Sequence, residues 1–419
     1  MAYLVKDISQ LITCRNNFNH PKYGKEQSDI GLIENGNVFV DKRKIEFVGN
    51  TVALKKFLKN YGKKNVKVID GKNKTVIPGF IDSHTHFVFS GSRAVEYEMR
   101  IKGHTYEEIA KAGGGILSTV NSVRKTSKKA LLNLSESRLT NFVMNGTTTI
   151  EGKSGYGLDT KNEIKMLEVL NDLNTNNKYG LDILPTFLGA HSIPQEMIKR
   201  DYIELVCYEM VPLIAKKGLA KFIDVFCERG YFNAKESQQV LSIGAKFGLI
   251  PKMHTDQFNS VGGINTAINV NAISVDHLEE IEFTDIKRLQ GKNIIATLLP
   301  GVSYFLDITY QPARVLIENN IPVVLATDFN PGSCMTENMQ MIMSLASLKL
   351  KMSAEEIINA VTINAAHALF LQDKLGSIEV GKQADLLIFN FDSYKDLLYH
   401  FGINQLQTVI KKGKIVYNS

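Results

Sequence analysis

Five of the nine histidines in the 419-residue chain follow short apolar segments that are typical of buried parallel strands. His84 and His86 are separated by one residue, so on an extended segment both imidazoles point to the same side and can bind one metal ion. His254 and Asp328, which follow two later segments, would complete a set of three nitrogens and one carboxylate. Such a set suits Zn²⁺ or iron, and the sequence does not choose between them. The five histidines are His84, His86, His191, His254 and His277.

Hydrolysis is the chemistry that this set predicts. A bound metal can lower the pKa of water from 15.7 to about 7, and the resulting nucleophile suits an amide carbonyl. We assign proton transfer to Asp328 and His277, without choosing which of the two carries most of it. His277 can orient the water or stabilise charge on a substrate oxygen, and the alternative of a core histidine bonded to a neighbouring carboxylate stays open. No organic cofactor is required.

The elements that must position these side chains alternate between apolar segments and helical stretches, which indicates a parallel sheet with crossover helices. Eight such units predict a closed barrel, and the active site of a barrel lies where the carboxyl ends of the strands run into the following loops. The metal-binding candidates all lie at those ends. The strands that we expect are Val76–Ile81, Thr147–Glu151, Ile183–Leu188, Phe222–Phe226, Ile250–Met253, Ala272–Val275, Ile294–Leu298 and Pro322–Ala326.

Both ends of the chain have the pattern of short strands and turns. The Asn35-Gly36 pair predicts a hairpin, because these residues tolerate positive φ, and residues 408–417 predict a closing hairpin. Neither end is long enough to bury a core alone. The fold class is therefore α/β, with a distorted (β/α)8 TIM-like barrel over residues 76–374 and a small β-sandwich domain built from residues 1–75 and 375–419.

Composition argues against disulfide-stabilised, nucleic-acid-binding and membrane-spanning classes of protein. Cys14, Cys207, Cys227 and Cys334 form no C-x-x-C pair, which favours free thiols in the reducing cytoplasm. The net charge of +6 comes from lysines spread along the chain, so we expect no nucleic-acid partner. No apolar run approaches the roughly 20 residues that span a bilayer, so we expect no membrane partner.

One long motif and the later ligands together resemble the amidohydrolase superfamily. The motif is Pro78-Gly79-Phe80-Ile81-Asp82-Ser83-His84-Thr85-His86, and the segment 376–385 resembles the return of that superfamily to its small β domain. Two-metal members carry a modified lysine after the fourth strand. This chain has Cys227-Glu228-Arg229 there, so the resemblance implies a single metal ion, zinc or iron. Glu228 can support a ligand or act as a minor ligand.

Within that superfamily, three stretches resemble the imidazolonepropionase family. They are residues 89–93, residues 113–120 together with 153–158, and residues 327–333. The resemblance implies that water opens the ring of 4-imidazolone-5-propanoate at its cyclic amide C–N bond, giving N-formimidoyl-L-glutamate in histidine degradation. It also implies a homodimer.

The same resemblance assigns substrate contacts by position. Arg93 and Tyr156 would hold the propanoate, in agreement with the bidentate bonding of arginine to carboxylates. His191 would contact the ring. Some family members carry a glutamate at the position of Gln257, and an amide is no base at neutral pH, so Gln257 can only position a group through hydrogen bonds. The residues that would help to seat the propanoate are Asn330, Gly332 and Ser333.

Two rival functions are compatible with parts of this pattern. A purine or pyrimidine deaminase could use the same metal, but a neutral base gives no reason for the Arg93 and Tyr156 pair. A non-catalytic scaffold that has lost its metal would not be expected to keep all four ligands. Metal analysis separates the second rival from an enzyme.

Overall fold

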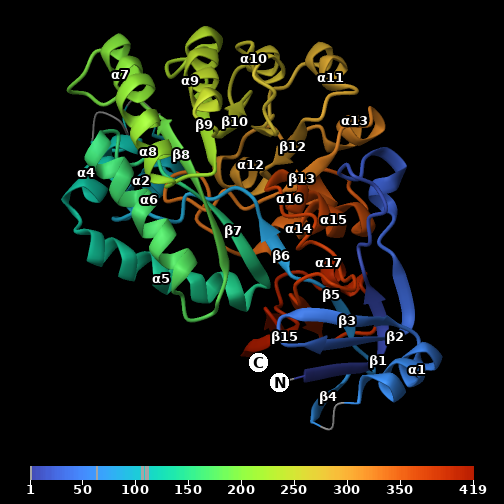
Figure 1. Ribbon diagram of the computed structural model, residues 1–419. Coiled ribbons are helices and arrows are strands. Elements are labelled where there is room, and N and C mark those ends of the chain that lie inside the picture. The colour runs from blue at the N-terminus through green and yellow to red at the C-terminus, as the bar shows by residue number, and fades with distance from the viewer. Residues whose placement is uncertain (1, 63–64, 105–107, 109–112) are drawn as a thin grey trace.

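The computed structural model describes residues 2–62, 65–104, 108 and 113–419 (Figure 1). A nearly closed parallel barrel and a separate sheet from both termini organise these residues, which confirms the predicted fold class. The barrel strands follow one another in chain order, each paired with the next. They are β6 (Phe80–Asp82), β7 (Thr147–Lys153), β8 (Asp182–Ala190), β9 (Phe222–Cys227), β10 (Ile250–Thr255), β11 (Ser274–His277), β12 (Ile295–Leu298) and β13 (Val323–Leu325).

The predicted strand Val76–Ile81 is wrong as a single strand. The chain instead forms β5 (Thr75–Pro78) in the terminal sheet and then β6 in the barrel. The change falls at Gly79, where an added Cβ would lie 2.3 Å from the Thr148 hydroxyl oxygen. Only a residue without a side chain allows this close approach, so the glycine marks the crossing between the two sheets.

The barrel closes just beyond the ends of its first and last strands. The backbone N–H of Asp328 donates to the carbonyl of His84 at 3.0 Å, and the N–H of His86 donates to the carbonyl of Phe329 at 2.9 Å. Thr85 and Phe329 form a parallel bridge. The closing contacts therefore place the segment after β13 directly beside the His84 and His86 pair.

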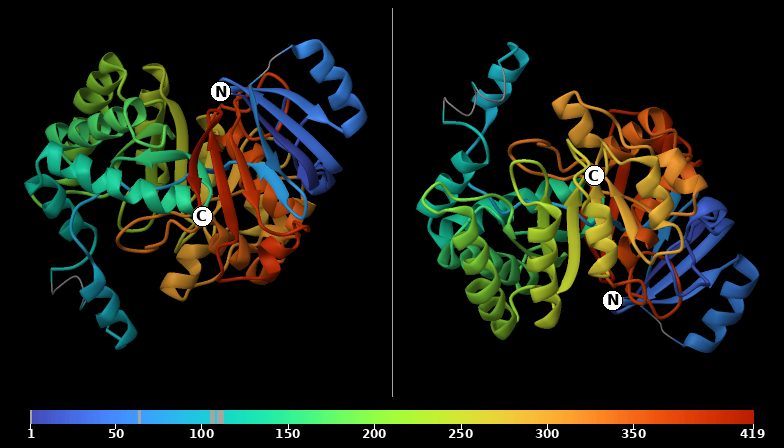
Figure 2. Two further views of the ribbon diagram at one scale, coloured as in Figure 1. Left: turned by 90° about the horizontal axis from the view of Figure 1, so that it is seen from below. Right: turned by 90° about the horizontal axis from the view of Figure 1, so that it is seen from above.

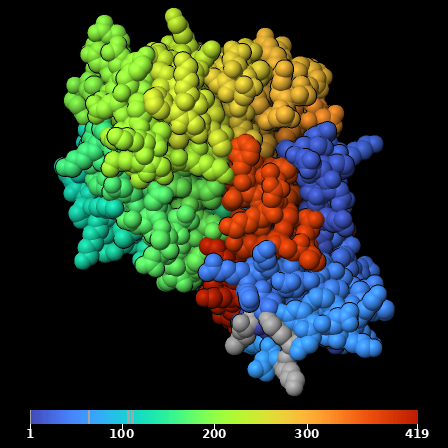
Figure 3. Space-filling model, in the orientation of Figure 1, coloured from blue at the N-terminus to red at the C-terminus, as the bar shows by residue number. Residues whose placement is uncertain are grey.

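Strands from the two ends of the chain pair in the terminal sheet, and Figure 3 shows the first and last segments together at its lower right. The predicted closing hairpin is confirmed by the antiparallel pair β15 and β16. The predicted hairpin at Asn35-Gly36 is wrong, because both residues lie inside a strand that continues opposite an irregular segment of β1. The strands not yet named are β1 (Ala2–Ile12), β2 (Leu32–Asp41), β3 (Lys44–Gly49), β4 (Val66–Asp70), β14 (Leu386–Phe389), β15 (Leu406–Lys411) and β16 (Lys414–Asn418).

Helices cover the outside of the barrel, and the segment that carries α2 projects from its body (Figure 2). Between strands and helices lies the main hydrophobic core, with Leu167, Val225 and Val240 fully buried. The helices are α1 (Thr51–Tyr61), α2 (Ala94–Ile101), α4 (Ile116–Lys125), α5 (Lys128–Met144), α6 (Thr160–Thr175), α7 (Lys199–Leu205), η2 (Val206–Met210), α8 (Val211–Lys217), α9 (Ala234–Lys246), α10 (Gly263–Asn269), α11 (Phe283–Leu289), α12 (Pro300–Leu306), α13 (Ala313–Glu318), α14 (Met339–Lys349), α15 (Ala354–Ala360), α16 (Ile363–Ala368) and α17 (Asp396–Tyr399), with a 3₁₀ turn η1 (Gly24–Ser28).

Two further expectations can be compared with this fold. All four cysteines are buried and free, which confirms the prediction of thiols without disulfides. Within the described residues, no helix combines the length and the apolar character that crossing a membrane requires.

Candidate metal centre and substrate cavity

The predicted metal ligands converge at the carboxyl ends of the barrel strands. One carboxylate oxygen of Asp328 lies 3.4 Å from His84 Nε2 and 3.3 Å from His86 Nε2. His254 Nε2 lies 3.4 Å from His86 Nε2. Tetrahedral ligands held about 2.0–2.1 Å from one cation lie about 3.3–3.4 Å from one another, so these separations fit a shared ion.

Unpartnered atoms support the same interpretation. His84 Nε2 and Asp328 Oδ1 are both buried, and neither has a hydrogen-bonding partner. A buried polar atom without a partner costs free energy, and such atoms are rare in folded proteins. A cation between these atoms would satisfy both. The donor set present in the chain therefore fits a metal ion.

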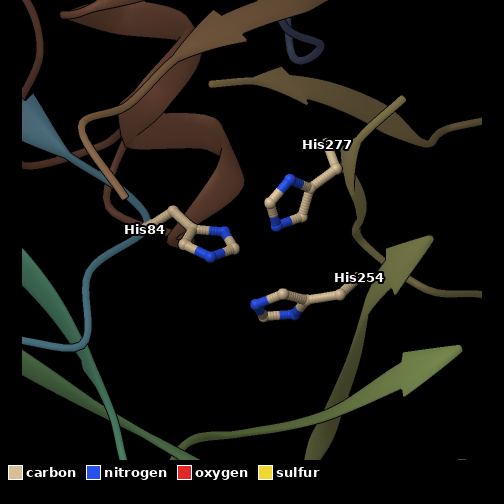
Figure 4. Close-up of side chains that lie close together, drawn as sticks. All are labelled: His84, His254 and His277. Carbon is tan, nitrogen blue, oxygen red and sulfur yellow. The ribbon is translucent and has the colours of Figure 1, made fainter. Parts of the chain in front are cut away.

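His277 lies at the end of β11 and completes a second metal-capable group with His84 and His254, whose ligand atoms lie within 4.8 Å of one another. Figure 4 shows the three rings reaching from separate segments toward one shared space. His277 has a φ of 88°, a backbone conformation that residues other than glycine rarely adopt. Its Nδ1 also lies 3.4 Å from Glu279 Oε1, so the bonded-carboxylate alternative is compatible with a ring that faces the centre.

Two carboxylates that the sequence analysis did not single out lie behind the histidines. Asp276 Oδ2 lies 2.7 Å from His84 Nδ1, and Asp224 Oδ2 lies 2.9 Å from His254 Nδ1. A carboxylate beside Nδ1 favours the imidazole tautomer that carries its proton on Nδ1. Nε2 is then unprotonated and can bind a metal. Each of the two rings is therefore oriented from behind.

The electrostatics favour the protonation states that metal binding requires at two of the ligands, Asp328 and His254. Burial would raise the pKa of Asp328, but the close contacts and charges of His84 and His86 hold it well below its ordinary value. Burial is the main cause that lowers the pKa of His254 to about 3, against the opposing charge of Asp224. At neutral pH Asp328 is thus ionised and His254 is neutral.

A cavity of about 300 Å³ opens beside the centre. Its wall contains every residue that the sequence analysis proposed for substrate contact, together with apolar and basic side chains that it missed. The proposed residues are Arg93, Tyr156, His191, Gln257, Asn330, Gly332 and Ser333. The additional wall residues include Glu96, Arg100, Phe226, Phe258 and Ile308.

Sequence comparison is consistent with this geometry. The chain is 45% identical to the imidazolonepropionase of Shouchella clausii (strain KSM-K16) over 99% of its length and 93% of the relative. It is 44% identical to the imidazolonepropionase of Geobacillus kaustophilus (strain HTA426), covering 99% of this chain and 97% of the relative. The chain belongs to the imidazolonepropionase family. Residues 251–416 also match the model of the amidohydrolase family, whose members bind metal.

Solved structures with low sequence identity share the fold of this imidazolonepropionase family member. An adenosine deaminase from Xanthomonas campestris with bound zinc is 15% identical, with a TM-score of 0.71 over 99% of this chain and 92% of that one. An atrazine chlorohydrolase from Arthrobacter aurescens TC1 complexed with zinc is also 15% identical, with a TM-score of 0.68 over 99% and 94% of the two chains. At this identity the likeness concerns the fold alone.

In this member of the imidazolonepropionase family, Arg93 is held by a residue one helical turn away. Glu96 Oε2 accepts from Arg93 Nε at 2.8 Å and lies 2.7 Å from Nη2. Arg93 Nη1 lies against Gly332, where an added Cβ would be only 2.0 Å away. Arg100 donates to the carbonyl of Gly332 at 3.3 Å. The i, i+3 spacing of Arg93 and Glu96 was the signal in the sequence that could have identified this pair.

Asn330 shapes the loop after β13 by bonding to its backbone. Its Oδ1 accepts the N–H groups of Gly332 and Ser333, each at 2.8 Å, and its Nδ2 donates to the carbonyl of Asp328 at 2.7 Å. The side chain thereby ties the loop beside Arg93 to the proposed metal ligand.

Tyr156 lies on a loop that a buried carboxylate holds from below. Glu163 Oε1 accepts the N–H groups of Gly157 at 2.7 Å and Leu158 at 2.9 Å, and its Oε2 accepts that of Gly155 at 3.0 Å. Burial, the largest influence, raises the pKa of Glu163 above its ordinary value despite these bonds. The first turn of α6 therefore fixes the loop that carries Tyr156.

Glu228 bonds to the neighbouring loop instead of joining any metal-capable group of the described residues. Its Oε2 accepts the N–H groups of Phe258 at 2.9 Å and Asn259 at 3.1 Å, and its Oε1 accepts from the Asn259 amide at 2.9 Å. Gln257 precedes these residues and lines the cavity. The arrangement favours a supporting role for Glu228.

Proposed function

We propose that the chain hydrolyses the cyclic amide C–N bond of 4-imidazolone-5-propanoate to N-formimidoyl-L-glutamate, a step of histidine degradation, with one bound metal ion. The observation that carries this proposal is that the candidate metal site and the candidate substrate cavity lie next to each other. A metal-capable set of His84, His86, His254 and Asp328 adjoins a cavity lined by Arg93 and Tyr156. The family membership supports the substrate.

His84, His86, His254 and Asp328 would hold the metal, which is zinc or iron. When bound, the ion supplies a water molecule whose pKa is lowered to about 7. Asp328 is ionised and buried, so besides holding the ion its carboxylate would accept a proton from the attacking water. His277 stabilises charge on the substrate oxygen and shares in proton transfer, with Glu279 holding the far side of its ring.

Arg93 binds the propanoate group of the substrate. Glu96 pairs with Nε and with one N–H of Nη2, so Nη1 and the second N–H of Nη2 can bond the substrate carboxylate, and Tyr156, which also lines the cavity, donates to it. Burial raises the pKa of Tyr156, so its hydroxyl remains a donor at neutral pH. His191 contacts the imidazolone ring, and Gln257 positions the reacting groups through hydrogen bonds. Asn330, Gly332 and Ser333 seat the carboxylate from the loop after β13.

The experiment that tests this function follows the absorbance of 4-imidazolone-5-propanoate with the purified, metal-loaded protein. We expect loss of substrate absorbance and formation of N-formimidoyl-L-glutamate. A purine and a pyrimidine with exocyclic amino groups serve as alternative substrates, and we expect neither to be deaminated. Release of ammonia from either base, with the imidazolone left intact, would reject the proposal in favour of a deaminase.

Three finer points extend the proposal. Elemental analysis of the purified protein should find close to one equivalent of zinc or iron in each chain. Sedimentation should show a homodimer. The enzyme should work in the cytoplasm, on a small molecule and without a nucleic-acid or membrane partner.

A further inference from the structure

A group of charged side chains fills the barrel interior directly behind the proposed metal ligands. Its members come from β7, β9, β10 and β11, and the side chain of each has no exposed surface. We call this group the barrel charge layer. It consists of Glu151, Lys153, Asp224, Lys252 and Asp276.

The two lysines bridge the three carboxylates. Lys153 Nζ lies 2.9 Å from Glu151 Oε1, 2.8 Å from Asp224 Oδ2 and 3.7 Å from Asp276 Oδ2. Lys252 Nζ pairs with Glu151 Oε2, donates to the carbonyl of Ser83 at 3.0 Å, and lies 3.9 Å from Asp276 Oδ2. Every carboxylate of the layer therefore faces at least one ammonium group.

Two of these carboxylates are the ones that contact the metal-binding histidines. Asp276 Oδ2 bonds His84 Nδ1 at 2.7 Å, and Asp224 Oδ2 lies 2.9 Å from His254 Nδ1. The lysines do not themselves reach the ligand atoms, so they act on the histidines only through the two aspartates. This makes the layer a chain of contacts that runs from ammonium to carboxylate to imidazole.

If either lysine were removed, the buried carboxylates of the barrel charge layer would lack the positive charge that balances them. An uncompensated buried carboxylate is costly, and it relieves that cost by turning toward another donor. That movement would weaken the contact that orients His84 or His254. Oxygen and nitrogen atoms of Asp224, His254 and Asp276 also lie within 4.8 Å of one another, and Lys153 supplies the positive charge at that place.

We propose that Lys153 and Lys252 are positioning residues for the metal centre. Their ammonium groups hold Asp224 and Asp276 in the geometry that keeps Nε2 of His254 and His84 directed at the metal. This inference rests on the proposed function, because it assumes that these histidines bind a metal.

The test compares Lys153→Met with Lys411→Met. Lys411 is a matched control, because its side chain is equally buried and lies 2.7 Å from Asp182 Oδ2 and 2.7 Å from Asp385 Oδ2 in the terminal sheet. Zinc affinity is measured by competition with a chelator, and the visible absorption spectrum of the Co²⁺-loaded protein reports the ligand geometry. Neither measurement depends on turnover.

We expect Lys153→Met to bind zinc about 10- to 100-fold more weakly, the range found when partners of metal ligands are lost, and to change the Co²⁺ spectrum. Lys411→Met should keep the affinity and the spectrum of the parent protein, whatever it loses in thermal stability. Equal affinity and an unchanged spectrum in Lys153→Met would overturn the inference. An equal loss of affinity in Lys411→Met would overturn it as well.

A double variant, Lys153→Met with Asp224→Asn, keeps the inference testable if Lys153→Met does not fold. The amide introduced by Asp224→Asn would still accept from His254 Nδ1 through its oxygen, and the net charge of the layer would equal that of the parent protein. We expect the double variant to bind zinc nearly as tightly as Asp224→Asn alone, because Lys153 acts mainly through Asp224, at 2.8 Å, and more weakly through Asp276, at 3.7 Å. A further tenfold loss in the double variant would contradict this. If the parent protein binds no metal at all, the proposed function fails and not this inference alone.

Discussion

Asp328 and His84 contact each other twice, once through the backbone and once through their side chains. The N–H of Asp328 donates to the carbonyl of His84 at 3.0 Å, and Asp328 Oδ1 lies 3.4 Å from His84 Nε2. The contact that closes the barrel therefore also brings the first and last proposed metal ligands together. Barrel closure and site assembly depend on the same few residues, which explains why a distant aspartate joins the His84 and His86 pair.

The first prediction concerns Asp328→Asn. We expect kcat to fall at least about 100-fold, because the variant weakens a proposed ligand and removes the proton acceptor. The steady-state rate with imidazolone propanoate and the metal content of the same sample are the measurements. Asp182→Asn, which removes a carboxylate of β8 at the junction with the terminal sheet, should leave both unchanged at temperatures where it is folded. A near-native kcat in Asp328→Asn would contradict the mechanism.

Arg93→Ala tests the carboxylate site. Loss of one charge-assisted hydrogen bond, worth about 1.5–3 kcal/mol, should raise KM roughly 10- to 100-fold while the metal content stays normal. A substrate analogue with an uncharged side chain should lose much less of its kcat/KM in the same variant. Unchanged KM for imidazolone propanoate would remove Arg93 from the site.

Gly332→Ala should reproduce part of that defect without touching the arginine itself. The new Cβ would lie 2.0 Å from Arg93 Nη1 and 2.7 Å from its Cζ, so the guanidinium must move. We expect a raised KM, normal metal content and normal thermal stability. Gly291→Ala is a control for KM alone, since nothing lies within 4 Å of a Cβ added there, although its φ of 68° makes alanine cost stability. A parental KM in Gly332→Ala would show that the position of Arg93 does not matter.

The barrel could be predicted from the sequence because its strands are buried on both faces and therefore form continuous apolar segments. The histidines at their ends were recognisable for the same reason. Two local predictions failed because in each case the same sequence pattern is compatible with two different structures. The apolar segment around Gly79 continues across a change of sheet, and Asn35-Gly36 serves an irregular strand as well as a turn.

Apart from Glu228, which the sequence analysis named as a possible support, the main supporting residues of the site were not predicted. Asp224 and Asp276 lie on strands that looked like ordinary core, and their partners lie on other strands. Glu163 looks like an ordinary first-turn acid of a helix, yet it holds the loop of Tyr156. The contacts of Asp224 and Asp276 depend on how distant segments meet in space, and no local spacing encodes them.

Glu163→Gln tests that loop contact. The carboxylate of Glu163 accepts from the N–H of Gly155 with Oε2 and from the N–H of Gly157 with Oε1. An amide has only one acceptor oxygen, so the glutamine side chain cannot accept from the two groups with separate oxygens. We expect a raised KM, because Tyr156 is held less firmly, and a loss of about 1–3 kcal/mol of stability. Glu204→Gln on α7 is the control, since Glu204 is exposed. Unchanged KM and stability in Glu163→Gln would show that the loop does not depend on this carboxylate.

The last prediction concerns pH and the junction between barrel and terminal sheet. Asp182, at the start of β8, lies 2.7 Å from Lys411 Nζ and 2.8 Å from Lys412 Nζ. Burial would raise the pKa of Asp182, but the charges and hydrogen bonds of Lys411 and Lys412 hold it well below its ordinary value. A carboxylate with a lowered pKa in the folded state stabilises the protein at pH values above its unfolded pKa of about 3.9. That stabilisation is lost as the pH falls from there through the folded pKa.

Asp182→Asn should therefore have a lower thermal midpoint than the parent protein at pH 7, and the difference should shrink below about pH 4, where the unfolded chain binds the additional proton. Thermal unfolding of both proteins across this pH range measures the effect. A difference that stays constant from pH 7 to the lowest pH at which both proteins fold would show that the ion pairs of Asp182 do not stabilise the junction.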